Sequence, residues 1–323
     1  MTTHAIRVSE TGGPEALEWV EVDEPVTGPG RLLVDVHAAG VNFIDTYHRS
    51  GLYPLPLPFV PGSEGAGTVI EVGPEVEGFS VGDAVAWTGV LGSYTTRLSV
   101  PVAAALPVPA GMSLDVAAAL PLQGMTAHYL ACDTHPLRAG DRCLVHAGAG
   151  GTGRLLVQIA KLRGAEVVAT AGGPRKCELA RSAGADHVID YDATDLVEAV
   201  EAAVGPDAID VVYDGVGAAT FDAGLAVLRR RGMMVTFGNA SGPVPEIAPL
   251  VLMPKSLYLT RPTLFDHITT REELMARWTD LTTWVDEGRL EVRIGHTFEL
   301  AEAAEAHRAL QGRATTGKIL LRA

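Results

Sequence analysis

Cysteine is scarce in this chain of 323 residues. The three cysteines share no spacing typical of metal ligands or of a disulfide framework. The ten histidines are scattered, and no two of them are four residues apart, although spacing alone leaves a site made only of histidines open. We expect a protein without a metal ion. The cysteines are Cys132, Cys143 and Cys177, and Cys143 lies in an expected buried strand.

Long hydrophobic runs and dense positive charge are also lacking. Glycine, proline or charged residues interrupt every apolar stretch before it reaches the roughly 20 residues of a membrane span. The N-terminal MTTHAIRVSE has no charged-then-apolar signal pattern, so we expect a cytoplasmic protein. The net charge of −14 argues against nucleic acid or anionic membranes as partners. The one dense basic run, Arg229–Arg231, is expected to cap a helix at Phe221–Leu228.

The segment Arg142–Gly164 has the pattern of strand, glycine turn and helix in immediate succession. Gly148, Gly150 and Gly153 follow the G-x-G-x-x-G spacing, which permits a tight turn and close approach of the backbone to a pyrophosphate. The anion then binds to the N–H groups that open the helix. This segment predicts a dinucleotide phosphate site.

Apolar strands alternate with helix-length segments after this turn, which predicts a doubly wound parallel sheet. A further β-rich run, Ser256–Thr260, follows a proline-containing loop, and we expect it to be an edge strand that could pair with a second subunit. The expected strands are Glu166–Thr170, His187–Ile189, Ile209–Tyr213 and Met233–Phe237, and the helices between them include Pro174–Ser182 and Leu196–Val204.

An acidic residue is missing from the end of the second of these strands, where an NAD-preferring site uses one to bind the ribose hydroxyl. The strand continues instead into two glycines, a proline and the cations Arg175 and Lys176. Cations are mildly unfavourable in the first turn of a helix, and a 2′-phosphate would account for them. The sequence therefore predicts NADPH as the cofactor.

The first 120 residues contain short β-like runs separated by glycine and proline turns, which predicts a mostly antiparallel, barrel-like domain. The proline-rich loop Tyr53–Pro61 cannot be a central strand and is a candidate pocket rim. The C-terminal segment has no glycine motif and is expected to complete this domain. We therefore predict one domain from residues 1–124 and 263–323, and a nucleotide-binding domain from residues 125–262.

Seven segments, spread over the chain, carry a family resemblance: GVNFIDTYHRSGLYP (Gly40–Pro54), PGSEGAG (Pro61–Gly67), LQGMTAHYL (Leu122–Leu130), HAGAGGTG, VVYDGVG (Val211–Gly217), FGNASG (Phe237–Gly242) and YLTRP (Tyr258–Pro262). Together they resemble the zinc-independent quinone oxidoreductases of the medium-chain dehydrogenase/reductase superfamily, the zeta-crystallin-like family. The resemblance implies a GroES-like, mostly β catalytic domain, a Rossmann domain for NADPH, and a homodimer. In zinc-dependent relatives a cysteine stands at the position of Asn42 and a histidine at that of Ser63.

The resemblance also implies which residues contact the cofactor. Two positions depart from the family pattern: Gly173, where relatives often have Ser or Thr, and Gln123, where some have Lys. Plain packing is the alternative role for Thr126, Tyr191 and Phe237. The implied cofactor residues are Thr126 near the nicotinamide, Gly150, Gly151, Thr152 and Gly153 at the pyrophosphate, Gly172, Lys176 and Tyr191 around the 2′-phosphate, Arg313 on the phosphate side, and Gly215, Phe237, Gly238 and Ser241 along the nucleotide.

The expected reaction is transfer of reducing equivalents from NADPH to a quinone or conjugated carbonyl. Without a metal, hydrogen bonds or a cation must stabilise charge on the acceptor oxygen. Asn42 and Arg261 can donate to it, Tyr47 can donate or relay a proton, and Tyr53 can form an aromatic wall. Alternatively, Asn42 and Tyr47 only position the nicotinamide, and Arg261 pairs with a carboxylate such as Asp45.

Two other functions remain open at this point. In a 2-alkenal or enoyl reductase the hydride acceptor is a C=C bond beside a carbonyl, and the same residues would surround it. A non-catalytic NADPH-binding protein, acting as a redox sensor or binding RNA, belongs to a different class, although the acidic charge weighs against RNA.

Overall fold

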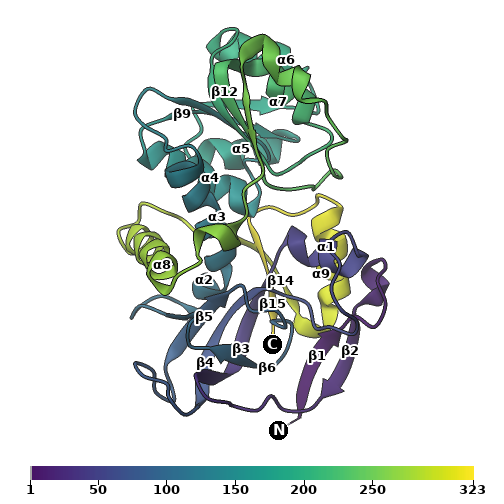
Figure 1. Cartoon of the computed structure of the whole chain (residues 1–323), viewed down its shortest axis with the longest axis vertical. Helices are drawn as coiled ribbons and strands as arrows, with labels where there is room; N and C mark the ends of the chain where they lie inside the picture. The colour runs from purple at the N-terminus through teal and green to yellow at the C-terminus, as the bar shows by residue number, and fades with distance from the viewer. Residues whose placement is uncertain (1) are drawn as a thin grey trace. The chain divides into compact units, whose positions relative to one another are not determined.

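The computed structural model describes residues 2–323, which divide into two compact units, and Figure 1 labels most of their helices and strands. Unit 1 contains the N-terminal segment up to Leu122, Ile268–Asp286 and Val292–Ala323. Unit 2 contains Gln123–His267 and Glu287–Glu291. No helix among the described residues is long and apolar enough to cross a membrane.

Unit 1 is built on a seven-stranded sheet in which all neighbours are antiparallel except β14 and β15. Its longest strand, β3, pairs with β4, β6 and β15, so it joins the N-terminal strands to the C-terminal ones. A hairpin of β1 and β2 lies outside this sheet. The strands are β1 (Thr3–Arg7), β2 (Glu18–Val22), β3 (Arg31–Val41), β4 (Glu64–Val72), β5 (Ala84–Thr88), β6 (Arg97–Pro101), β7 (Ala105–Pro107), β14 (Ile294–Glu299) and β15 (Lys318–Arg322).

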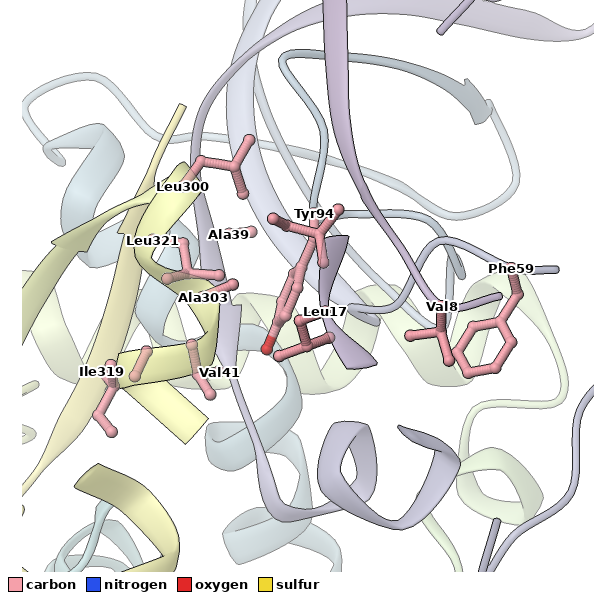
Figure 2. Packing of buried hydrophobic residues seen from close by; sticks show 12 residues of the cluster. Val8, Leu17, Ala39, Val41, Phe59, Tyr94, Leu300, Ala303, Ile319 and Leu321 are labelled. Atoms are coloured by element: carbon pink, nitrogen blue, oxygen red, sulfur yellow. The ribbon is translucent and has the colours of Figure 1, made fainter. Parts of the chain in front are cut away.

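Two clusters of buried side chains form the core of unit 1. One packs Trp87 against valines of β3, β4 and β5. The other, shown in Figure 2, gathers Tyr94, Leu17 and side chains of β15 and the C-terminal helix. Burial of these apolar surfaces is the main driving force for the unit to fold. The helices of unit 1 are α1 (Phe43–Ser50), α2 (Leu114–Ala119), α8 (Arg271–Asp286) and α9 (Ala303–Gln311).

Unit 2 is a six-stranded, fully parallel sheet with the order β10-β9-β8-β11-β12-β13. Numbered within the unit, this is the 3-2-1-4-5-6 order of the doubly wound dinucleotide-binding fold. The order reverses between β8 and β11, where such sheets bind ligands. The strands are β8 (Arg142–Val145), β9 (Glu166–Ala171), β10 (His187–Asp190), β11 (Ile209–Asp214), β12 (Leu228–Thr236) and β13 (Tyr258–Thr260).

The central strands of unit 2 are apolar on both faces because helices connect the parallel neighbours. Cys143 is fully buried in β8, as expected, and burial raises the pKa of its thiol. The helices are α4 (Gly151–Leu162), α5 (Pro174–Ser182), α6 (Leu196–Val204) and α7 (Phe221–Val227); α3 (Pro121–Tyr129) begins where the chain enters the unit.

The expected helix cap at Arg229–Arg231 is wrong. Helix α7 ends at Val227, and the three arginines belong to strand β12. Arg229 pairs with Asp210 of the neighbouring strand instead of with helix carbonyls. The edge strand is also shorter than expected, because Ser256 takes a left-handed conformation (φ 52°) that ends the 3-10 helix Pro249–Lys255 before β13 begins.

Candidate active site

The turn after β8 packs so closely at Gly148 and Gly153 that neither position has room for a side chain. A Cβ on Gly153 would clash with the carbonyl oxygen of Ala147, and one on Gly148 would lie 2.9 Å from Cβ of Ala169 in β9. Gly150 is the N-cap of α4, and Gly151 and Thr152 form its first turn. The first N–H groups of this helix lack intrahelical acceptors, which makes them donors for an anion.

A second glycine pair lies after β11 and β12. A Cβ on Gly215 would lie 2.9 Å from the ring of Phe237, and one on Gly238 would clash with the carbonyl of Gly215. Ser241 Oγ donates to the carbonyl of Val216 (2.9 Å). The structure thus brings these four predicted cofactor residues together at the carboxyl ends of neighbouring parallel strands.

The loop after β9 contains the predicted residues Gly172 and Lys176. A Cβ on Gly172 would lie 2.8 Å from the hydroxyl of Tyr191, so these two residues also lie together. Lys176 is in the first turn of α5 and is half-buried. Thr126 lies in α3 and is 9% exposed, whereas Arg313 follows α9 in unit 1.

Three of the four predicted acceptor residues lie in or beside helix α1 of unit 1. The rings of Tyr47 and Tyr53 make an edge-to-face contact with centroids 5.2 Å apart, and the N–H of Tyr53 donates to the carbonyl of Tyr47 (3.1 Å). Asn42 is the N-cap of α1, where its backbone N–H donates to Asp45 Oδ2 (2.8 Å). Arg261 belongs to unit 2 and donates to the hydroxyl of Thr236 and the carbonyl of Gly238.

The side chain of Asn42 is held by a buried ion pair that the sequence analysis did not identify. Lys318 Nζ donates to Asn42 Oδ1 (2.8 Å) and forms an ion pair with Glu64. Asn42 Nδ2 donates to Glu64 Oε1 (2.6 Å) and, over a longer distance, to the carbonyl of Gly40 (3.3 Å). Lys318 and Glu64 are at most 1% exposed. The other oxygen of Glu64 accepts from the N–H of Leu122 (2.8 Å), at the start of α3.

A second buried chain of hydrogen bonds ends on Asp45. Arg49 can only donate, so Nδ1 of His307 accepts from it and Nε2 carries the proton. Nε2 of His307 then donates to the hydroxyl of Tyr94 (3.1 Å), which donates to Asp45 Oδ2 (2.9 Å). Burial is the largest cause of both pKa shifts here: it raises the pKa of Asp45 to about 7 and lowers that of His307 to about 3.

These residues carried little signal in the sequence. Glu64 lies in the segment PGSEGAG, which suggested a family but no role, and Lys318 is separated from it by 254 positions. The described residues include no group of three or more His, Cys, Asp or Glu side chains that could hold a metal ion.

Two family models match the chain. One describes the alcohol dehydrogenase GroES-like domain and matches residues 28–137; the other describes a zinc-binding dehydrogenase and matches residues 151–285. A quinone oxidoreductase of Pseudomonas aeruginosa is 43% identical over 98% of both chains. This chain belongs to the quinone oxidoreductase family. The predicted family and α/β fold class are confirmed.

Two further proteins are similar to this chain. The Escherichia coli quinone oxidoreductase, solved in complex with NADPH, superposes with a TM-score of 0.96 at 40% identity, over 99% of this chain and all of that one. A 2-haloacrylate reductase of a Burkholderia species is 40% identical over 97% of each chain.

Proposed function

We propose that this protein reduces quinones with NADPH. The observation that carries this function is the nearly full-length likeness to quinone oxidoreductases, one of them solved with NADPH. The glycine geometry of unit 2 supports it, because side chains at Gly148 and Gly153 would disrupt the tight turn that leads into α4, whose first N–H groups can bind a pyrophosphate. In this proposal residues 1–124 and 263–323 form the GroES-like catalytic domain, and residues 125–262 the Rossmann domain.

All the proposed cofactor residues except Arg313 belong to unit 2. Gly150, Gly151, Thr152 and Gly153 would hold the pyrophosphate on the N–H groups of α4. Gly215, Phe237, Gly238 and Ser241 would line the nucleotide, with Gly172, Lys176 and Tyr191 around the 2′-phosphate. Thr126 would lie near the nicotinamide, and Arg313 would face the phosphate side of the cofactor. NADPH, when bound, supplies the hydride.

The acceptor would be oriented by Asn42, Tyr47, Tyr53 and Arg261. One of the two N–H groups of Asn42 Nδ2 donates to the Gly40 carbonyl over the longer distance of 3.3 Å. This weaker donor is the one that would bind the acceptor oxygen instead. Tyr53 supplies an aromatic wall, supported by the ring of Tyr47. The hydroquinone also needs a proton, which Tyr47 or solvent can provide.

A C=C reductase is the second candidate, and the 2-haloacrylate reductase relative favours it. A polarised double bond beside a carbonyl accepts a hydride in the same way as a quinone. Loss of nicotinamide absorbance tests both functions, with a benzoquinone, a naphthoquinone, a 2-alkenal and an enoyl thioester as acceptors. We expect oxidation of NADPH with the quinones. Oxidation with only the alkenal or the thioester would move the function to C=C reduction.

We also propose that the protein is a homodimer in the cytoplasm. Strand β13 is the last strand of the described sheet of unit 2, and its side chains Tyr258 and Leu259 are 58% and 36% exposed. Leu250 and Met253, just before it, are 68% and 67% exposed. An exposed apolar edge strand of this kind can pair with the same strand of a second copy.

A further inference from the structure

Strand β9 ends without an acid, but the strand beside it brings two carboxylates to the same edge of the sheet. β9 and β10 are parallel, and Asp190 lies opposite Ala171. The residues that follow these two positions therefore leave the sheet side by side. Asp190 is the last residue of β10, and Asp192 lies in the turn that follows this strand.

Both carboxylates face the glycines that follow β9. Asp190 Oδ1 accepts from the backbone N–H groups of Gly173 (2.9 Å) and Asp192 (3.1 Å). A Cβ on Gly172 would lie 2.7 Å from Asp192 Oδ2 and 2.8 Å from the hydroxyl of Tyr191. The Asp192 carboxylate and the Tyr191 hydroxyl thus lie together against Gly172.

This arrangement makes the site proposed for the 2′-phosphate less favourable to a phosphate group. The N–H of Gly173 already donates to Asp190, and no side-chain hydroxyl is present at that position. Asp192 is exposed, so its repulsion of a phosphate dianion is screened by water and salt but not abolished. The free 2′-hydroxyl of NADH, in contrast, can donate to a carboxylate.

We propose that Asp192 determines cofactor specificity in this protein, by weakening the preference for the 2′-phosphate and by accepting a hydrogen bond from the ribose of NADH. The inference rests on the proposed function and adds NADH as a second cofactor. Asp192 supplies from the third strand the acidic group that NAD-preferring sites place at the end of the second strand.

Binding of two fragments tests the proposal without turnover. Adenosine 2′,5′-bisphosphate and 5′-AMP differ only in the 2′-phosphate, and calorimetry gives the Kd of each. In D192N we expect the ratio of the Kd of 5′-AMP to that of the bisphosphate to rise about threefold to tenfold, because a like charge is removed. The increase should shrink as salt is added.

The control is E201Q, which removes one negative charge from an exposed position of α6 and should leave the ratio unchanged. The Kd values of NADPH and NADH should follow the fragments, with NADPH binding more tightly to D192N and NADH more weakly. An unchanged ratio in D192N, with NADPH still bound, would overturn the role of Asp192 and leave the proposed function intact. A wild-type protein that binds neither dinucleotide would overturn the proposed function itself.

Discussion

Glu64 and Lys318 form a buried ion pair in unit 1. Removing one partner leaves the other buried without a counter-charge. Both side chains are buried, and Glu64 also accepts hydrogen bonds from Asn42 and Leu122, so the loss of stability from removing one partner is large. We predict that K318M lowers the free energy of unfolding by about 3–5 kcal/mol. The double variant E64Q/K318M should recover much of the loss, because no unpaired charge remains. Urea unfolding of the two single variants and the double variant measures the coupling; strictly additive losses would contradict it.

Tyr47 and Tyr53 share a ring contact but have different proposed roles, which gives a matched pair of variants. If Tyr47 passes a proton to the acceptor, Y47F should lower kcat about a hundredfold with little change in NADPH affinity. Y53F should leave kcat near that of the wild type, since an aromatic wall does not need the hydroxyl. Quinone-dependent turnover of both variants checks this, and an unchanged kcat in Y47F would remove Tyr47 from the proton-transfer step.

Asp45 lies in the first turn of helix α1, where its carboxyl accepts a hydrogen bond from the backbone N–H of the N-cap residue Asn42, so the charge of this buried group affects the start of the helix. The folded-state pKa of Asp45, about 7, is above its ordinary value of 3.8. The resulting stabilisation is present below pH 3.8 and is lost as the pH rises towards 7.

The variant D45N isolates this effect, because an amide cannot ionise. Between pH 4 and 7 we expect the wild type to lose stability relative to D45N, by up to about 4 kcal/mol. The contribution of His307 to stability depends on pH in the opposite direction. Its pKa of about 3 in the folded state stabilises the protein above pH 6.5, and this stabilisation is lost as the pH falls. Denaturant unfolding across this range measures the difference between the two proteins, and a difference independent of pH would contradict a titrating Asp45.

The assembly of the whole molecule depends, in the proposal, on strand β13. Charged side chains on an edge strand prevent pairing, so L259K should convert a dimer into a monomer. The matched control is V26K, which changes an 85% exposed valine of unit 1 in the same way. Light scattering after size exclusion gives the mass of each protein. A wild type that is already monomeric, or an L259K variant that stays dimeric, would refute this interface.

The local parts of this molecule were predictable from sequence, and the long-range contacts were not. Gly148, Gly150 and Gly153 lie within six positions, so their spacing alone predicts the turn that the structure shows. Glu64 meets Lys318 only because β3 lies between β4 and β15, and no spacing encodes that contact. Asp192 was missed for a related reason, since a parallel neighbour, not the same strand, brings it to Gly172.

The stoichiometry of one anaerobic reaction shows whether this protein reduces quinones with NADPH. The protein is mixed with NADPH and a benzoquinone, and the oxidised nicotinamide and the hydroquinone are both quantified. One hydride and one proton convert a quinone to a hydroquinone, so we predict one hydroquinone for each NADPH consumed, at a rate that is proportional to the protein concentration. NADPH that binds but is not oxidised by any quinone would contradict the account.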